Sequence, residues 1–402
     1  MRLKIGFVTG EYPPMEGGVG AFTKELAKEL AGQGHEIHII TSKRARPRDE
    51  KRSLWDVKEP YEIGYATLHA QVGRWRWGAL SSVAAAAARF DLDIVNIQYQ
   101  AIAYDMRIPA INFLPWRLRE VSPVVATFHD LRVPYLFPKA GRLRRGVVNN
   151  LAKTAEGVIC TNLEDAQILE EIGIHGQCMA VIPIGSNIAV NEPSTEEILA
   201  VRSKLGLKAV DHLIGYFGFI NASKGVDTLL LAMTALPLDA HLIFIGGQTG
   251  SSDSKGNQRI LEKLRVMVRN LDLGDRVHWS GFLPDRDISI YLNASSVVVL
   301  PFADGVSFRR GTFMAVAAHG RPLITTNPKV PMAELKHGEN VWLSPIDDVP
   351  SLGQAIVDVL SDQELQKKLG QGARTLSHLF DWEGIARQTA EFYSKIINLQ
   401  TS

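Results

Sequence analysis

The sequence predicts an α/β protein made of two doubly wound domains, each with a parallel sheet. Its 402 residues are too many for one ordinary core. Short apolar runs, typical of buried parallel strands, alternate with amphipathic helices. The alternation starts again after a polar stretch at 191–211, so we expect two domains with a cleft between them, joined near residues 184–190.

The first half begins with a strand at 3–10 and an amphipathic helix that starts at Gly18 and stops at Gly34. A second strand is expected at 36–41. Further buried strands are predicted at 93–99, 123–129 and 157–161.

The second half repeats this order. Strands are expected at 213–220, 241–247, 276–282, 297–300 and 322–326, with helices at 224–236 and 258–274 between the first three. The last segment, 381–400, reads as an amphipathic helix that follows the second domain.

The net charge, the number of cysteines and the lengths of the apolar runs exclude some classes of function. A net charge of +1 gives no reason to expect nucleic acid as a partner. Two cysteines, Cys160 and Cys178, are too few for a disulfide framework and favour a reducing cytoplasm. The N-terminus lacks the apolar core of a signal peptide, and no apolar run is long enough to span a bilayer. We therefore expect a cytoplasmic protein.

Two basic runs, at 42–52 and 139–145, stand out against this balance. Both lie in the N-terminal half, and Trp75 and Trp77 are between them. One interpretation is a pair of solvated loops. The other is a surface that faces anionic lipid, which would place the protein peripherally at the inner face of a membrane, or an anionic acceptor.

The segment 297–326 carries the most informative motif. A strand ends at Pro301, and a loop with two adjacent arginines leads into a small-residue helix that ends at Gly320. Arginines beside the free N–H groups of a helix N-terminus can hold an anionic group. The alternative is a surface loop with solvated arginines. The polar and glycine residues of this loop are Asp304, Gly305, Ser307, Arg309, Arg310 and Gly311.

Two other loops follow the first strand of their domains. Gly17, Gly18 and Gly20 would let the backbone approach a phosphate or sugar, although their spacing is not that of a dinucleotide-binding fingerprint. In the second half, Lys224 precedes a helix and could offer its charge to a diphosphate. The competing interpretations are a tight turn for the glycines and a solvated lysine beside a capping Ser223.

Polar side chains end two strands of the first half. His129 and Asp130 follow one strand, and Gln98 and Tyr99 end another. The neutral groups of Gln98 and Tyr99 suit a polyhydroxylated ligand better than a metal ion. We expect no metal site, because Asp91 and Asp93 lie at the start of a strand, away from the edge where ligands bind.

Taken together, these segments resemble glycosyltransferase family 4, the retaining nucleotide-sugar transferases of GT-B fold. The resemblance implies two Rossmann-like domains: an acceptor-side domain at 1–186 and a donor domain at 187–381. It also implies a last helix, 382–402, that crosses back to the first domain and docks through Trp382. The segments that carry it are YPPMEGGVG, GQGHEIHIITS, DIVNIQYQ, VVATFHD, IPIGSNI, FGFINASKGVDTLL, LDLGDRVHWSGFLP, VVVLPFADG and AAHGRPLITTN.

The sequence departs from the family pattern in the donor domain. Lys224 matches the lysine of the family, but Phe219 stands where an arginine is expected. Counted back from AAHG, the two glutamates of the Glu-x7-Glu motif fall on Ser307 and Ala315. Anchored on Asp304 instead, which we prefer, the motif keeps one acidic residue, and residues 309–311 are an insertion. In both alignments the second glutamate is absent.

The resemblance implies metal-independent transfer of a sugar from a nucleotide-diphosphate sugar to a glycan, lipid-linked or small-molecule acceptor, with no permanently bound cofactor. A GT-B phosphorylase or epimerase, and a non-catalytic sugar-nucleotide-binding subunit, remain as alternatives. The residues expected to act in catalysis are His129, Lys224, Arg310 and Asp304. Those expected at the nucleotide sugar are Gly17, Gly18, Gly20, Asn221, Ser223, Gly246, Phe282, Gly305, Ser307, Arg309, Gly311 and Thr312, and those on the acceptor side are Gln98, Tyr99 and Asp130.

Overall fold

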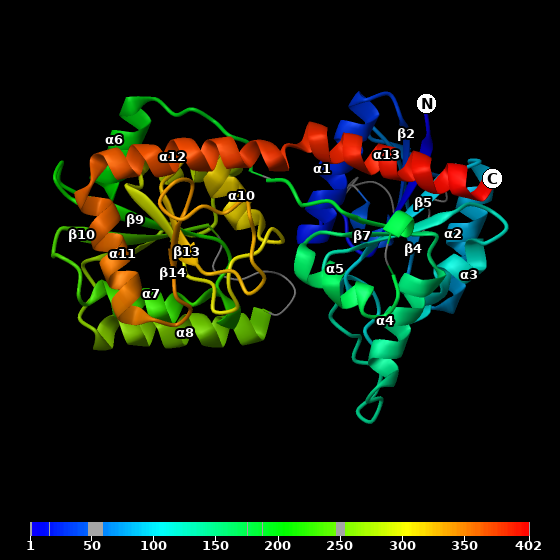
Figure 1. Ribbon diagram of the computed structural model, residues 1–402, viewed down its shortest axis with the longest axis horizontal. Coiled ribbons are helices and arrows are strands. Elements are labelled where there is room, and N and C mark those ends of the chain that lie inside the picture. Colours follow the sequence, from blue (N-terminus) through cyan, green and yellow to red (C-terminus); the bar gives the residue numbers. More distant parts are fainter. Residues whose placement is uncertain are drawn as a thin grey trace, which may run out of the picture. The chain divides into compact units, whose positions relative to one another are not determined.

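The computed structural model describes residues 2–15, 17–46, 59–174, 176–186, 188–246 and 254–401. The chain divides into two compact units (Figure 1). Unit 1 is Met1–Ile184 with Trp382–Ser402, and unit 2 is Gly185–Asp381. The last helix, α13 (Trp382–Thr401), therefore belongs to the unit that begins the chain.

Unit 1 contains an eight-stranded sheet in the order β3-β4-β2-β1-β5-β6-β7-β8. Every neighbouring pair is parallel except β3 and β4. The chain passes from β1 outward in both directions, so the sheet has its topological switch point between β1 and β5. The strands are β1 (Lys4–Thr9), β2 (Glu36–Ser42), β3 (Tyr61–Glu62), β4 (Thr67–Val72), β5 (Ile94–Tyr99), β6 (Val124–Phe128), β7 (Gly157–Cys160) and β8 (Met179–Val181).

Helices cover both faces of this sheet, and the central strands β5 and β6 are buried along their whole length. The core on one face includes Leu26 and Leu30 from α1 and Tyr393 from α13. The core on the other face includes Val83 from α2 and Val148 from α4. The helices are α1 (Gly18–Gly32), α2 (Trp77–Arg89), α3 (Leu114–Leu118), α4 (Leu143–Thr154) and α5 (Leu163–Glu170), with 3-10 turns η1 (Lys43–Ala45), η2 (Ala101–Ala103), η3 (Ala110–Phe113) and η4 (Gly176–Cys178).

Unit 2 contains a six-stranded sheet in the order β11-β10-β9-β12-β13-β14, with all neighbouring pairs parallel. Its switch point lies between β9 and β12. In open α/β sheets, ligands bind outside the carboxyl ends of the strands at such a point. The strands are β9 (His212–Phe217), β10 (Ala240–Ile245), β11 (Val277–Trp279), β12 (Val297–Leu300), β13 (Leu323–Thr326) and β14 (Trp342–Ser344).

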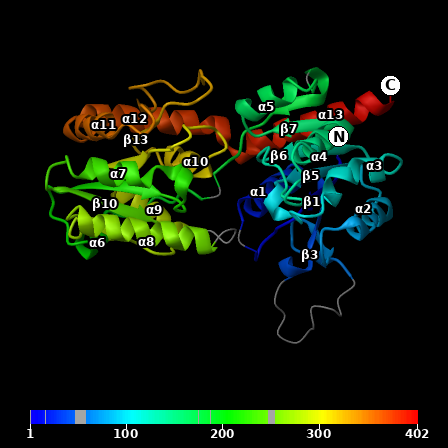
Figure 2. The same cartoon turned by 90° about the horizontal axis from the view of Figure 1, so that it is seen from below.

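The helices of unit 2 lie on both sides of its sheet, as Figures 1 and 2 show. They are α6 (Thr195–Lys204), α7 (Val226–Met233), α8 (Ser254–Asn270), α9 (Asp285–Ala294), α10 (Gly311–Ala318), α11 (Val349–Ser361) and α12 (Gln363–Ser377), with 3-10 turns η5 (Ala222–Lys224) and η7 (His378–Phe380). The predicted fold class, two Rossmann-like α/β domains, is confirmed.

Two expectations of the sequence analysis concern membranes. Within the described residues, no helix is long and apolar enough to cross a membrane. The basic run 42–52, which was considered as a lipid-facing surface, lies largely outside those residues, which stop at position 46 and resume at position 59. Arg46 itself is buried, and its Nε donates to the Ala70 carbonyl at 2.9 Å, so this arginine supports the fold.

Candidate active site

The loops that follow β9 and β12 are locked together at the switch point of unit 2. The Ala303 N–H donates to the Ser223 carbonyl at 3.1 Å. Gly225 has a left-handed φ of 61°, and a Cβ there would lie 1.9 Å from the Pro301 carbonyl oxygen. Only glycine fits this position. The close approach brings the loop of Lys224 beside the loop that follows Pro301.

Two cations of these loops gather at one aromatic ring. The Lys224 Nζ lies 4.9 Å from the centroid of the Phe302 ring, and the Arg310 guanidinium carbon lies 4.8 Å from it. Phe302 is buried, and its carbonyl accepts a hydrogen bond of 2.7 Å from the Thr326 hydroxyl. The ring is thus a fixed platform, and cation–π attraction orders the two cations near it.

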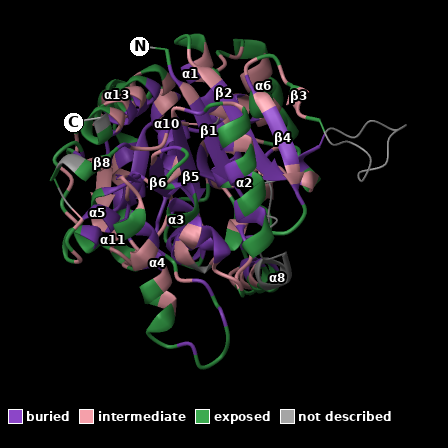
Figure 3. Cartoon of the chain, turned by 90° about the vertical axis from the view of Figure 1, so that its right-hand side faces the viewer, coloured by how far each residue is buried: buried purple, intermediate pink, exposed green. Residues whose placement is uncertain are grey.

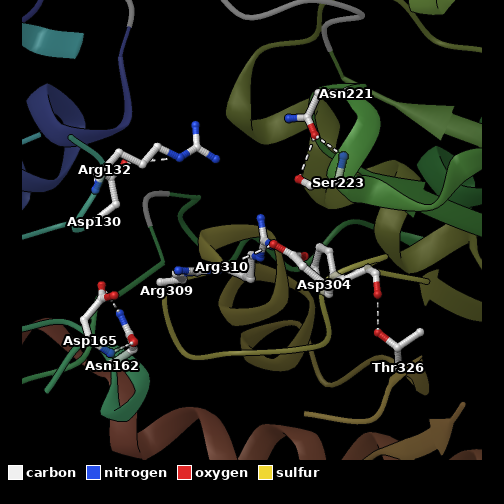
Figure 4. A network of polar contacts seen from close by, with 11 residues as sticks. Asp130, Arg132, Asn162, Asp165, Asn221, Ser223, Asp304, Arg309, Arg310 and Thr326 are labelled. Atoms are coloured by element: carbon white, nitrogen blue, oxygen red, sulfur yellow. Dashed lines mark hydrogen bonds and ion pairs between the residues drawn. The ribbon is translucent and has the colours of Figure 1, made fainter. Parts of the chain in front are cut away.

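Asp304 is the acidic partner of this cluster. Its carboxylate accepts a hydrogen bond from Arg310 and forms an ion pair with Arg309 at 3.5 Å (Figure 4). Gly305, next along the chain, has a φ of 77°, and a Cβ there would lie 2.7 Å from the Asn327 carbonyl oxygen. The turn that presents Asp304 to the arginines therefore requires this glycine.

The cluster has more positive than negative charge. Burial, together with the charges of Arg310 and Arg309, lowers the pKa of Lys224 to about 7, and the charge of Asp304 opposes this shift. Burial also lowers the pKa of Arg310. Burial and repulsion from the two arginines disfavour the charged form of Lys224. A bound anion would offset both effects, so the cluster favours an anionic ligand.

Polar atoms beside the cluster are buried with no hydrogen-bond partner among the described residues. They are Ser307 Oγ, Arg310 Nε and Thr312 Oγ1. Gly218 lies against the last of these side chains, since a Cβ on it would be 2.6 Å from Thr312 Cγ2. Buried polar groups are normally paired, so three unpaired ones where the loop enters α10 indicate a place for a polar ligand.

The other predicted donor-site residues of unit 2 have varied surroundings. Asn221 Oδ1 accepts hydrogen bonds from the Ser223 N–H at 3.0 Å and the Ser223 hydroxyl at 2.9 Å, so both side chains shape the turn before Lys224. Gly246 directly follows β10 and has a φ of 99°. Phe282, beyond β11, is 81% exposed. Ligand contacts of these residues remain predictions.

In unit 1, His129 is held at the end of β6 by one polar and one aromatic contact. Its Nε2 lies 2.8 Å from Gln98 Oε1, and its ring meets the Phe22 ring edge-on with centroids 4.8 Å apart. Phe22 in turn packs on Trp382 of α13 at 5.3 Å. Burial lowers the pKa of His129 to about 3, so the imidazole is neutral near pH 7.

A buried chain of amides fixes the tautomer of this imidazole. Asn96 Nδ2 donates to the Tyr393 hydroxyl at 2.7 Å, and Gln98 Nε2 donates to Asn96 Oδ1 at 2.6 Å. Gln98 therefore presents its oxygen to His129, and the neutral ring donates from Nε2. The lone pair lies on Nδ1, which can accept a hydrogen bond from a hydroxyl group.

The structure corrects the prediction that Gln98 and Tyr99 line the acceptor side. Both are fully buried, with 0% and 1% exposure. Consecutive strand residues point to opposite faces, and helices cover both faces of this sheet. Gln98 supports His129 from behind, and the Tyr99 hydroxyl accepts a hydrogen bond from Asn112 at 3.1 Å in the core.

Asp130, the third predicted acceptor-side residue, is partly buried. It accepts hydrogen bonds from the Gln100 side chain at 3.1 Å and the Arg132 N–H at 3.2 Å. These contacts hold the start of the loop after β6. A role at the acceptor remains a prediction.

The glycine loop of unit 1 holds an internal anion. The Glu11 carboxylate accepts hydrogen bonds from the Val19 N–H at 3.1 Å and the Gly20 N–H at 3.3 Å, at the N-terminus of α1. A Cβ on Gly17 would lie 2.0 Å from this carboxylate, whereas one on Gly18 would have open space. Two backbone N–H groups of the loop that was expected to approach a phosphate or sugar are thus bonded to the chain's own carboxylate. Burial raises the pKa of Glu11, and the two hydrogen bonds oppose this.

Sequence reasoning missed four residues of these sites. Phe302 and Glu11 could have been found, since each follows a predicted strand at the edge where ligands bind. Asn96 and Tyr393 gave no local signal, because they are 297 positions apart and meet only in the folded unit. The interpretation of Asp93 as a residue of the strand start is confirmed: its carboxylate accepts the Lys4 N–H at 2.7 Å.

These features define a GT-B glycosyltransferase, and comparisons with known proteins agree. The family profile described as Glycosyltransferase Family 4 matches residues 16–190, and that described as Glycosyl transferases group 1 matches residues 198–376. The chain belongs to glycosyltransferase family 4.

Relatives and solved structures match nearly the full length of the chain. The N-acetyl-alpha-D-glucosaminyl L-malate synthase of Bacillus anthracis is 24% identical, over 99% of this chain and 98% of its own. The alpha-monoglucosyldiacylglycerol synthase of Streptococcus pneumoniae is 23% identical, over 80% of this chain and 70% of its own. The sucrose-phosphate synthase of Thermosynechococcus elongatus has a TM-score of 0.75 at 22% identity, over 99% of this chain and 100% of its own. The HepE protein of Anabaena, solved with UDP and glucose, has a TM-score of 0.74 at 20% identity, over 98% of this chain and 100% of its own.

Proposed function

We propose that the chain transfers a sugar from a nucleotide-diphosphate sugar to an acceptor hydroxyl, with retention of the anomeric configuration and without a metal ion. The observation that carries this proposal is the pair of cations, Lys224 and Arg310, held at the Phe302 ring beside unpaired buried polar atoms. A diphosphate supplies the negative charge and the acceptor oxygens that this site lacks. The structure of Anabaena HepE with UDP-glucose, a protein of the same fold, supports a donor of this class.

The cations act on the leaving group. As the bond between the anomeric carbon and the diphosphate oxygen breaks, negative charge grows on that oxygen, and Lys224 with Arg310 and Arg309 stabilises it. The acceptor oxygen forms the new bond on the same face of the sugar. Its proton passes to the departing phosphate, so no protein base is required.

Each unit offers one polar group to substrate hydroxyls. Asp304 would accept hydrogen bonds from sugar hydroxyls, and its ion pairs with Arg309 and Arg310 hold its carboxylate in place. His129 would accept a hydroxyl at Nδ1, because Gln98 holds the proton on Nε2. The acceptor is a glycan, a lipid-linked sugar or a small molecule. Two relatives carry names that mention a glucosyldiacylglycerol and L-malate, and these support the last two classes.

The test compares Lys224→Ala and Arg310→Ala with the wild type against a panel of nucleotide sugars. Release of nucleoside diphosphate gives the rate, and proton NMR of the new anomeric centre gives the stereochemistry. Each variant should lose about a hundredfold in kcat. Arg286→Ala is the matched control, since this arginine pairs with Glu197 on the exposed surface of unit 2 and should keep full activity.

Other outcomes would overturn the proposal. Undiminished turnover in both variants would remove the diphosphate site from the reaction. Donor binding without release or transfer indicates a non-catalytic subunit, and turnover only with free phosphate as co-substrate indicates a phosphorylase. Loss of activity on treatment with a chelator, restored by a divalent cation, would contradict the metal-independent mechanism.

A further inference from the structure

The segment 132–146, between β6 and the first turn of α4, projects from unit 1. Figure 1 shows it as the loop that extends beyond α4, and Figure 3 shows that much of its surface is exposed. The proposed donor site and the network around His129 do not use this segment. We call it the α4 projection.

The α4 projection exposes three large apolar side chains. Tyr135 is 44% exposed, Phe137 is 50% exposed and Leu143 is 62% exposed. Leu136, between the two aromatic residues, is 8% exposed, and its N–H donates to the Met106 carbonyl at 2.7 Å. Leu136 thereby anchors the loop to the body of unit 1, while the residues on either side of it face solvent.

Arginines of the same segment brace it. Arg144 donates to the Phe137 carbonyl at 2.9 Å and to the Pro138 carbonyl at 3.3 Å, and its guanidinium lies 5.1 Å from the Tyr135 ring centroid. Arg145 reaches the Leu131 carbonyl at 3.5 Å. The aromatic residues are therefore presented by a loop with internal support, which reduces the entropy lost when they bind a partner.

The charge of the projection is strongly positive. Residues 132–146 contain no acidic residue, and the preceding Asp130 has a side chain that is only 13% exposed. The basic residues are Arg132, Lys139, Arg142, Arg144 and Arg145. All of them except Arg144 are exposed. Such a cluster is attracted to the negative surface of an anionic bilayer.

We propose that the α4 projection docks the protein onto an anionic lipid surface, with Phe137 and Leu143 inserted among the headgroups and the arginines and lysine held at the phosphates. The combination favours lipid over a soluble polyanion. A polyanion would be bound by the cations alone, whereas exposed aromatic and leucine side chains gain free energy only when they leave water. The proposal does not depend on the proposed reaction.

The experiment measures co-sedimentation of the full chain with vesicles of phosphatidylcholine, with and without phosphatidylglycerol. One double variant, Lys139→Glu with Arg142→Glu, reverses charge. Another, Phe137→Ser with Leu143→Ser, removes the apolar contacts. The matched control, Lys208→Glu with Leu238→Ser, changes the same residue types at exposed positions of unit 2. The thermal unfolding midpoint and nucleoside-diphosphate binding report whether each variant is folded.

The wild type and the control should bind anionic vesicles and not neutral ones, and each projection variant should bind roughly tenfold or more weakly. Equal binding of neutral and anionic vesicles, or unchanged binding of both projection variants, would overturn the proposal. Loss in the charge-reversed variant alone would also overturn it, in favour of a soluble polyanion. If a double variant does not fold, its place in the co-sedimentation experiment is taken by a single variant, Arg142→Glu for the charge reversal or Leu143→Ser for the apolar contacts, with the same expected outcomes.

Discussion

The Nε2 atom of His129 lies 2.8 Å from Oε1 of Gln98, and this contact sets both the tautomer and the orientation of the imidazole. Because the Gln98 amide nitrogen is used by Asn96, the glutamine can only accept from the histidine. A neutral ring with a defined acceptor atom is thus available at the carboxyl end of β6 over the whole physiological pH range.

The first prediction concerns acid stability. The pKa of His129 is about 3 in the folded chain, against an ordinary pKa of 6.5 for a histidine in the unfolded chain. As the pH falls through this window the unfolded chain takes up the proton first, so the stability contributed by neutral His129 is present above 6.5 and is lost toward 3. The wild type should lose up to about 1.4 kcal/mol per pH unit more than His129→Gln, measured by urea unfolding. Parallel curves for the two proteins would contradict this.

The second prediction tests the far end of the same network. Tyr393→Phe removes the hydroxyl that accepts from Asn96 Nδ2 at 2.7 Å inside the core of unit 1. The free energy of unfolding should fall by about 1–2 kcal/mol, because a buried N–H loses a partner. Tyr135→Phe, at a 44% exposed position, is the control and should change stability by less than about 0.5 kcal/mol. Equal effects at the two sites would show that the buried hydrogen bond contributes nothing.

The third prediction uses the pKa of about 7 for Lys224. At pH 8 most of the free protein holds this lysine neutral, and a bound diphosphate would restore its charge. Binding of a nucleoside diphosphate should therefore take up nearly one proton per site, measured by calorimetry in buffers of different ionisation enthalpy. Lys224→Met should bind more weakly and take up no proton. Proton uptake that persists in the variant would assign the titration to another group.

The fourth prediction separates binding of the diphosphate from sugar transfer. Asp304 competes with a phosphate for Arg309 and Arg310, and all three side chains are less than one third exposed. Asp304→Asn should therefore bind a nucleoside diphosphate about fivefold more tightly. Its kcat with a nucleotide sugar should fall, because the carboxylate acceptor for sugar hydroxyls is lost. Weaker diphosphate binding would mean that Asp304 holds the arginines in their productive positions.

The fifth prediction compares two glycines with similar, left-handed φ angles. Gly225 has a φ of 61° and Gly338 a φ of 70°. A Cβ on Gly225 meets the Pro301 carbonyl oxygen at 1.9 Å, whereas a Cβ on Gly338 meets open space. Gly338→Ala should cost about 1–2 kcal/mol through backbone strain alone. Gly225→Ala should cost several kcal/mol more or prevent folding of the Lys224 loop, measured by thermal unfolding and nucleoside-diphosphate binding. Equal costs would show that the two loops separate easily.

Local sequence was sufficient for the order of strands and helices and for the place of the donor loop. Strands such as β1 and β12 are mostly apolar runs, and glycine and proline mark where they end. The carboxyl ends of parallel strands share one edge, so Lys224 and Arg310 could be assigned to the same region before their distances were known. Strands β3, β4, β8 and β14 were missed, since β3, β8 and β14 have only two or three residues and β4 has no clear apolar pattern.

The tertiary structure alone decided which side chains touch and how they are charged. It placed Lys224 and Arg310 at the Phe302 ring, bonded the glycine loop to Glu11, and buried Gln98 behind His129. These outcomes depend on strand register, on which face each side chain takes, and on burial. All three come from contacts between residues far apart in sequence, and they also set the pKa values of the lysine and the histidine.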